Sequence, residues 1–457
     1  MVRSVMRGEV GAMLALAAPL AGANLAQMAM GLTNAMMVGR LGGASLAAAG
    51  LGAALYFTLA MVCQGVLIAV APLAAHAIGR GEPEAAGRIG GAGMMLAAML
   101  ALPVLALLTV APHALALIGY EAALAADITR YLSAVQWGAP AFLGFVVLRA
   151  MLSATTRVRP IMLVLLLGVA ANAALNWALI FGHLGFPALG IFGSGAATAI
   201  IQWVMLLALA GYVRISRLRL LGVGRRFGAE LRLIVGLGLP ISGLLALEVG
   251  LFNAAGVVMG LFGADALGAH QLAINFASLT FMVPLGMAQA ATVRVAFQLG
   301  ARNYAAARRA GLVALALGGA VMLAPCALML AAPWAITGIY LDLGEAANLG
   351  TAATAVRLLA IAGIFQVFDG LQVIAAGALR GYRDTALPMA IAAFGYWGIG
   401  FVGGWVFAFP LGGGAVGLWW GLALGLAVVA LLLSLRLHFR SRAEDGAPVV
   451  AATVLSD

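Results

Sequence analysis

Long apolar runs alternate with short hydrophilic joints along almost the whole chain. A helix that crosses a bilayer needs about 20 consecutive apolar residues, and most of these runs are at least that long. The pattern predicts an all-α polytopic membrane protein with twelve transmembrane helices. The expected spans are 11–38, 46–78, 90–110, 123–148, 160–182, 190–213, 233–260, 267–299, 311–332, 349–379, 386–409 and 414–437.

Arginine is concentrated in every second joint, which fixes an expected orientation. One set of joints holds most of the arginines, including those of the long central joint at 214–232, whereas the other set holds Arg40 and little else. By the positive-inside rule both termini and the central joint are cytoplasmic. The net charge of +10 is spread over these joints rather than gathered in a basic domain, so no nucleic-acid partner is expected.

The two halves of the chain align with each other. A shift of 221 residues superposes many positions of the first half on the second without a gap, and the shift is 228 further along. Examples are Pro19 and Pro240, Gly65 and Gly286, Gly79 and Gly300, and, at 228, Pro160 and Pro388. Because each half has six spans, the repeats are parallel, which predicts two six-helix bundles that rock against each other. The expected divisions are an N-lobe at 1–213, a cytoplasmic linker at 214–232, a C-lobe at 233–437 and a cytoplasmic tail at 438–457.

Two acids lie inside apolar spans, Glu248 in the seventh and Asp369 in the tenth. A charged side chain at the bilayer centre costs about 2.5–3.5 kcal/mol on insertion scales, so such residues usually face a cavity, a cation or a proton. A protonated acid that is hydrogen-bonded within the bundle is the alternative. Two acids on two spans predict a shared site for a cation, and they would be the only metal ligands, for Na⁺, if sodium is that cation.

Amide side chains form stripes on the same and other spans. They are Asn24, Gln27 and Asn34 on the first span, Asn172 and Asn176 on the fifth, and Gln366 and Gln372 beside Asp369 on the tenth. Steps of three and four residues place each stripe on one face of its helix. The 221-residue shift superposes Gln27 on Glu248, so the repeated position is polar in both lobes. These amides either line a path between the lobes or simply tie helices together.

Several classes of chemistry find no support in the chain. It contains no lysine and no GxxxxGK[ST] loop, and its five histidines are not at metal-ligand spacing. Cys63 and Cys326 lie within apolar runs, which suggests neither a disulfide framework nor a metal site. We therefore expect a protein that is not an enzyme and needs no cofactor. Any uphill transport would be driven by an ion gradient or by a partner.

Three strings carry a resemblance to a known family. They are GLPISGLLALEVGLF at 238–252, GAHQLAINFASLTFMVPLGMAQAATVRVAFQLG at 268–300 and FQVFDGLQVIAAGALRGYRDTALPM at 365–389. With them the chain resembles the multidrug and toxic compound extrusion (MATE) transporters of the NorM-type bacterial branch. The resemblance implies a V-shaped pair of six-helix bundles that alternates between inward and outward openings. It also implies export of organic cations and other drugs in exchange for entering Na⁺ or H⁺.

The resemblance also implies roles for individual residues. Glu248 and Asp369 are similar to the family's cation-site acids, and Phe365 stands where the branch often has an aromatic residue near the ion. Asn172 and Asn176 resemble its N-lobe polar residues, and the substrate cavity is expected to include Gln27, Gln366, Gln271 and Asn275 as well. Asn34 departs from the pattern, since many members carry an aspartate there. That departure places the coupling on the C-lobe acids.

The leading hypothesis is therefore a secondary antiporter, with H⁺ or Na⁺ as coupling ion and cationic, amphipathic small molecules as substrates. We expect a monomer surrounded by lipid in the bacterial inner membrane. The alternative is a flippase for lipid-linked precursors, which would want a strongly cationic cavity for a pyrophosphate. A membrane scaffold without transport activity leaves the two buried acids unexplained.

Overall fold

Twelve helical segments in the computed structural model are long and apolar enough to cross a membrane, as the hydrophobic pattern predicted. The structure describes residues 2–119, 121–222 and 227–445. The first half contains α1 (Val2–Gly39), α2 (Gly43–Leu67), α3 (Val70–Gly79), α4 (Pro83–Ile118), α5 (Ala122–Val135), η1 (Gln136–Gly138), α6 (Ala139–Ala154), α7 (Arg159–Phe181) and α8 (Gly190–Ile215). The second contains α9 (Gly228–Gly260), α10 (Ala264–Gly300), α11 (Tyr304–Ala331), α12 (Pro333–Tyr340), η2 (Ala346–Asn348), α13 (Leu349–Gly381), α14 (Ala386–Ala392), η3 (Ala393–Phe401), α15 (Val402–Ala408) and α16 (Gly414–Asp445).

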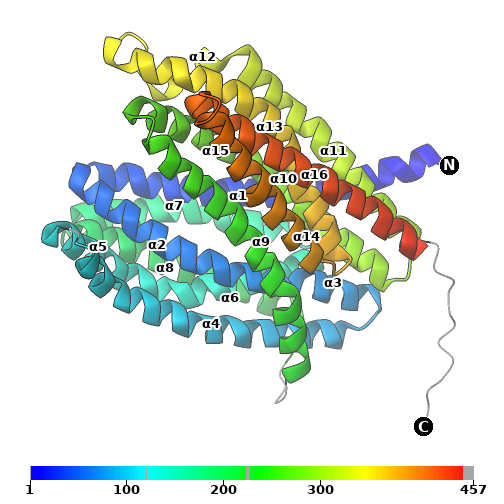
Figure 1. Cartoon of the computed structure of the whole chain (residues 1–457). Helices are drawn as coiled ribbons and strands as arrows, with labels where there is room; N and C mark the ends of the chain where they lie inside the picture. The colour runs from blue at the N-terminus through cyan, green and yellow to red at the C-terminus, as the bar shows by residue number, and fades with distance from the viewer. Residues whose placement is uncertain (1, 120, 223–226, 446–457) are drawn as a thin grey trace.

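The two halves fold into two lobes with corresponding packing (Figure 1). In the first lobe α2 packs on α5, α6 on α8, and α7 on α8, and in the second α10 packs on α13, α13 on α16, and α15 on α16. The turns correspond as well: Gly42 and Gly263, which are 221 residues apart, precede α2 and α10 with φ angles of 114° and 99°. A positive φ is readily adopted only by glycine. The register found in the sequence is thus visible in both helix packing and turn geometry.

Two of the expected boundaries between lobe, linker and tail differ from the observed helices. Helix α9 begins at Gly228, inside the expected linker, with Glu230 in its first turn. Helix α16 continues to Asp445, beyond the expected end of the C-lobe at 437, with Arg442 in its last turn. Acids at a helix N-terminus and bases at its C-terminus stabilise the helix dipole, which favours both extensions. Residues 223–226 of the linker and 446–457 of the tail lie outside the described residues.

Two spans depart from a continuous α-helix. The second span is interrupted at residues 68–69, just before Pro72, which cannot donate a backbone hydrogen bond to Ile68. The eleventh span contains the nine-residue π-helix η3. Segments of π-helix are rare and occur often at functional sites, because the extra residue per turn changes which side chains face a neighbouring helix.

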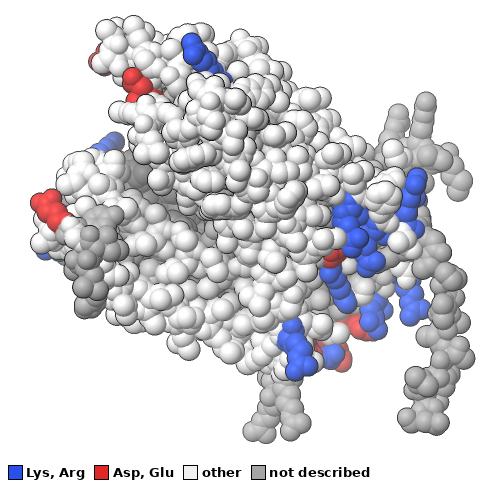
Figure 2. All heavy atoms as spheres, in the orientation of Figure 1, with Lys and Arg blue, Asp and Glu red and all other residues white. Residues whose placement is uncertain are grey.

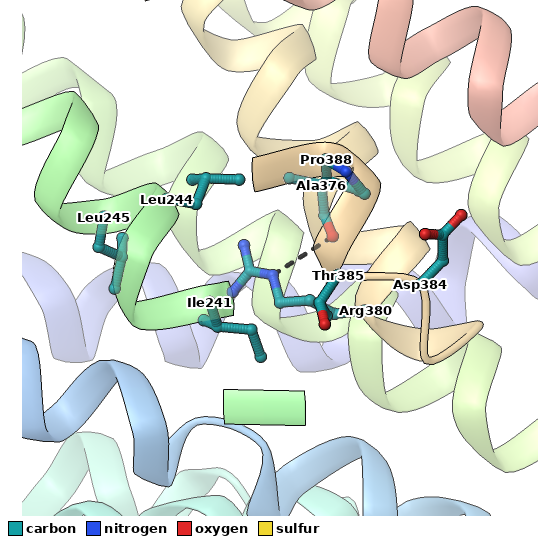
Figure 3. A pocket seen from close by; sticks show the side chains of 8 residues that line it. All are labelled: Ile241, Leu244, Leu245, Ala376, Arg380, Asp384, Thr385 and Pro388. Carbon is teal, nitrogen blue, oxygen red and sulfur yellow. Dashed lines mark hydrogen bonds between the residues drawn. The ribbon is translucent and has the colours of Figure 1, made fainter. Parts of the chain in front are cut away.

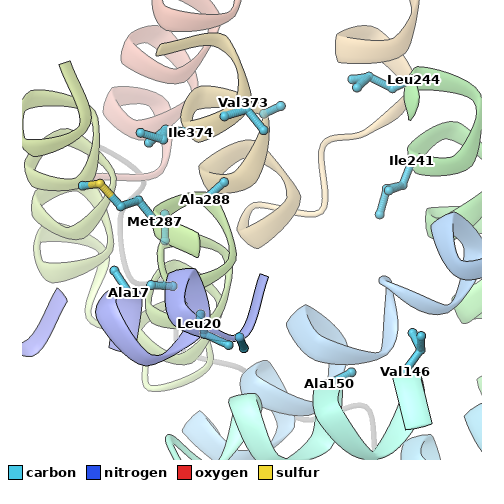
Figure 4. Close-up of a cluster of buried hydrophobic side chains, with 14 of the residues drawn as sticks. Ala17, Leu20, Val146, Ala150, Ile241, Leu244, Met287, Ala288, Val373 and Ile374 are labelled. Carbon is cyan, nitrogen blue, oxygen red and sulfur yellow. The ribbon is translucent and has the colours of Figure 1, made fainter. Parts of the chain in front are cut away.

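The lobes meet at one end of the molecule and splay apart at the other (Figure 1). Figure 2 shows arginines gathered at the end where the lobes meet and a hollow between the lobes towards the opposite end. A buried apolar cluster fills the closed end (Figure 4). There Ala17 and Leu20 of the first lobe lie near Met287 and Ala288 of α10, whereas Val146 of α6 lies towards α9. The hollow therefore opens to the arginine-poor side of the membrane.

Glycines on both lobes let the backbones at this closed end come into contact. A Cβ atom added to Gly65 would clash with Ser242 of α9, and one added to Gly286 would clash with the backbone of Ala21. The two contacts are related by the 221-residue register, as Ala21 corresponds to Ser242. Gly79 and Gly300 likewise approach the carbonyls of Phe297 and His76, which are also register partners. The seal is thus built twice, once from each repeat.

Candidate functional site

The structure brings the two membrane acids together in the C-lobe. Glu248 on α9 and Asp369 on α13 are only 8% and 6% exposed, and their carboxyl groups interact electrostatically with each other. The amide nitrogen of Gln372 donates to Oδ1 of Asp369 at 3.1 Å, and the same side chain also reaches Glu248. The amide oxygen of Gln372 has no hydrogen-bond partner among the described residues. Three side chains therefore converge with oxygen atoms available for a cation or a proton.

One guanidinium partly compensates these acids. Arg380, two turns beyond Gln372 on α13, is 8% exposed and interacts electrostatically with Glu248. Figure 3 shows its Nε bonded to the carbonyl of Ala376, beside a cavity of about 10 Å³ whose α9 wall is Ile241, Leu244 and Leu245. With both acids and this arginine ionised, the three groups carry one negative charge in total. One monovalent cation or one proton would neutralise them.

Tyr396 completes the site and was not singled out from the sequence. Its side chain is fully buried, interacts electrostatically with both Glu248 and Asp369, and has a hydroxyl group without a hydrogen-bond partner among the described residues. Tyr396 belongs to the π-helix η3, and its neighbour Trp397 fixes η3 to α9 by donating to the carbonyl of Leu247 at 3.2 Å. A tyrosine in an apolar run carries no periodic signal, so only the packed fold reveals it.

Aromatic side chains form the wall beside the acids. Phe365, which is 1% exposed, packs between Phe252 and Trp419 at ring-centroid distances of 6.4 and 5.6 Å. Gln366 is also fully buried and donates to the carbonyl of Ala277 at 3.3 Å. Both residues thus lie in the interior of the C-lobe close to Asp369. The predicted role of Phe365 beside the ion and that of Gln366 in the cavity stay predictions.

The first lobe holds an uncharged polar cluster at the expected amides. Oδ1 of Asn34 accepts from Nδ2 of Asn172 at 2.6 Å and from Nδ2 of Asn176 at 2.8 Å, and Nδ2 of Asn34 donates to Thr198 at 3.1 Å. The cluster joins α1, α7 and α8. Thr198 was not predicted, because a threonine alone is common in membrane helices. The amide oxygens of Asn172 and Asn176 have no partner among the described residues.

The amide stripe of α1 divides between two places. Asn24 and Gln27 do not join Asn34 but accept from the guanidinium of Arg149, which also donates to Gln289 of the opposite lobe at 2.9 Å. Arg149 was expected just beyond the fourth span, yet that span continues to Ala154. The reason is that these amides satisfy the guanidinium within the membrane-spanning part. Gln27 therefore lies at the seam between the lobes.

Two predicted cavity residues are exposed on α10. Neither Gln271 nor Asn275 is buried, and both lie in the half of α10 that begins at the arginine-poor end. Their position is compatible with the predicted contact to a substrate. No group of three or more metal-ligating side chains of the His, Cys, Asp or Glu type occurs within residues 2–119, 121–222 and 227–445.

The sequence matches a known family over both lobes. The MatE family model matches residues 19–178 and 240–406, so the second match begins 221 residues and ends 228 residues after the first. These offsets are those at which the chain aligns with itself. A probable multidrug resistance protein NorM of Burkholderia mallei is 43% identical over 439 residues, which cover 94% of this chain and 92% of that protein. The multidrug resistance protein NorM of Burkholderia vietnamiensis is 42% identical over 444 residues, with 95% and 94% coverage.

Solved structures show the same fold at lower identity. A mutant of the Vibrio cholerae MATE transporter VcmN superposes with a TM-score of 0.89 at 18% identity, covering 96% of this chain and 98% of that one. A MOP superfamily transporter from Pyrococcus furiosus superposes with a TM-score of 0.87 at 20% identity, with 96% and 97% coverage. The multi-pass helical architecture and the sequence agree, and neither is that of an enzyme. The chain belongs to the MatE family of transporters, in its bacterial NorM-type branch, as the resemblance of its sequence predicted.

Proposed function

We propose that the chain is a secondary active antiporter that exports small drug-like molecules, cationic and amphipathic ones above all, in exchange for Na⁺ or H⁺. Its NorM relatives are named as multidrug resistance proteins. The observation that carries the proposal is the buried acid pair Glu248 and Asp369, which with Arg380 leaves one uncompensated negative charge. A site with this charge attracts a cation from either side of the membrane.

Coupling follows if the ion and the substrate stabilise different conformations. A ligand shifts a conformational equilibrium only through its differential affinity for the two states. An ion bound at the acids removes the negative charge that attracts a cationic substrate, so the two compete. The outward-facing hollow and the closed arginine-rich end form one of the two states that this exchange requires.

Both proposed ions suit the groups that are present. Na⁺ prefers oxygen ligands, and the two carboxyl groups, the free amide oxygen of Gln372 and the hydroxyl of Tyr396 supply them. A proton needs only one carboxylate. The test is efflux of a fluorescent organic cation from proteoliposomes under a Na⁺ gradient at equal pH and, separately, under a pH gradient without Na⁺. Efflux that neither gradient drives would contradict the proposal.

The arginine distribution supports the proposed orientation in a bacterial inner membrane. The closed end carries most of the arginines, so both termini and the joint between α8 and α9 face the cytoplasm in this orientation. We infer a monomer, because each lobe pairs with the other within one chain and the hollow lies between them. Lipid surrounds the remaining apolar surface.

A flippase for lipid-linked precursors was the alternative. It would need a strongly cationic cavity, whereas the C-lobe interior has two acids against one arginine. Arg149 at the seam is already engaged by Asn24, Gln27 and Gln289. Together with the NorM relatives, this charge balance favours the antiporter.

Replacing Asn34 should affect stability more than coupling. Asn34→Ala removes the acceptor of two buried amides, and an unsatisfied buried amide costs about 1–3 kcal/mol. We expect a lower melting temperature, yet a smaller loss of gradient-driven efflux than in Asp369→Ala, because an amide does not change charge. Efflux and thermal unfolding of both variants, measured side by side, provide the comparison. A greater loss of coupling in Asn34→Ala would move the ion site to the first lobe.

The hydroxyl of Tyr396 should matter for the ion and little for folding. Tyr396→Phe removes no protein hydrogen bond seen in the described residues, so stability should be retained. A bond to a charged group contributes about 1.5–3 kcal/mol, which predicts at least a tenfold higher half-saturating concentration of the driving ion. The control is Tyr56→Phe, which breaks a bond to Gln202 of 2.8 Å in the first lobe. Equal ion dependence in the two variants would exclude Tyr396 from the site.

A further inference from the structure

A second cavity lies at the arginine-rich end, away from the acid pair. Its volume is about 500 Å³. The lining residues come from the ends of five helices of both lobes: His76, Leu299, Tyr304, Gly381, Tyr382, Arg383 and Arg440. Of these only His76, on α3, belongs to the first lobe. The proposed transport path does not use this cavity.

The cavity is electropositive. Arg383 and Arg440 line it, and no acid does. Arg80 lies close enough to act on Arg383, and burial together with this neighbour lowers the pKa of the Arg383 guanidinium. Like charges held close together and partly desolvated destabilise one another unless an anion joins them.

Nearby acids do not supply that anion. Glu82 is paired with Arg80 at 2.8 Å, and Asp384 is paired with Arg436 at 2.8 Å. The cavity therefore offers guanidinium groups, with the phenol groups of Tyr304 and Tyr382, to a ligand from outside. Guanidinium groups bind phosphate oxygens through paired hydrogen bonds, and basic pockets at the cytoplasmic ends of membrane helices are suited to anionic headgroups.

We propose that this cavity binds a phosphate group, which either an anionic phospholipid headgroup or free phosphate supplies. The ligand would also join the two lobes. His76 follows the break in the second span, and its carbonyl lies against Gly300 at the closed end. Separation of the lobes at this end would carry His76 away from Tyr304 and Arg383. Bound phosphate thus favours the state in which the cytoplasmic side is closed.

The lipid arm of the test uses the full-length protein in nanodiscs of phosphatidylcholine with 20 mol % spin-labelled phosphatidylglycerol. The measured quantity is the fraction of motionally restricted label. We expect Arg383→Gln to weaken the specific association about tenfold, as for loss of a charge-assisted hydrogen bond. The matched control is Arg157→Gln, which removes an exposed arginine from another joint at the same end and leaves the cavity intact. Arg383→Lys, which keeps the charge, should retain part of the binding.

The phosphate arm uses the same variants in neutral detergent with inorganic phosphate, at constant ionic strength against chloride. The readout is the shift of melting temperature. Binding that depends on Arg383 in the lipid arm alone assigns the cavity to a headgroup, and dependence in the phosphate arm alone assigns it to a soluble phosphate. If Arg383→Gln unfolds, Arg440→Gln is measured instead. Identical behaviour of the cavity variants and Arg157→Gln in both arms would overturn the proposal.

Discussion

Glu248→Gln and Asp369→Asn are each expected to abolish gradient-driven efflux while the protein stays inserted and folded. The replacements keep the size of each side chain and remove the negative charge that the coupling ion neutralises. One charge that crosses 100 mV supplies about 2.3 kcal/mol, enough for a concentration ratio of about 50. Without an ionisable acid this driving force is not transmitted, and the measured ratio should fall to one.

Proteoliposomes loaded with a fluorescent cation measure this ratio under each gradient. The control is Glu84→Gln, which neutralises an exposed acid in the first turn of α4 and should transport like the parent. Melting temperatures should not fall in the two site variants, because an amide is less costly to bury than an acid that ionises. Parental efflux in both site variants would remove the acid pair from the coupling mechanism.

Gly238→Val is expected to open the cytoplasmic seal. Gly238 of α9 lies directly against the backbone of Val66 in α2, where a side chain has no space. Overpacking of such a contact costs about 1–3 kcal/mol, which shifts a two-state equilibrium about 5- to 150-fold. The population that is closed at the arginine-rich end should fall accordingly, and with it the transport rate.

Spin labels at the outer ends of α2 and α10 report this shift. Ala44 and Ala264 are both exposed, and Ala264 is preferable to its neighbour Asp265, whose carboxylate accepts from Thr351 at 2.6 Å. The partly buried Cys63 and Cys326 are first replaced by serine. The mean distance between the labels should shorten in Gly238→Val.

The matched control for this substitution is Gly236→Val, which adds the same side chain two residues earlier on the same helix. Nothing lies within 4 Å of the added Cβ there, so the distance distribution should equal that of the parent. A Gly238→Val distribution that also equals the parent would mean that the lobes do not move about this contact.

The sequence determined the topology of the chain because the bilayer imposes simple rules. Length and hydropathy define the spans, arginine counts define the sides, and an intact 221-residue register reveals the duplication. The same rules isolated Glu248 and Asp369, since a charge within an apolar run is costly wherever the helix finally packs. Each of these signals is local or periodic, and none depends on which helices become neighbours.

The tertiary structure decided how the polar groups are partnered. The stripe of Asn24, Gln27 and Asn34 appears continuous in the sequence, yet its first two members bind Arg149 at the seam and the third binds the amides of α7. Tyr396 reaches the acids only because a π-helix turns it towards α9. Periodicity gives the face of a helix, but the partner across that face is set by packing between segments far apart in the chain, which no single segment encodes.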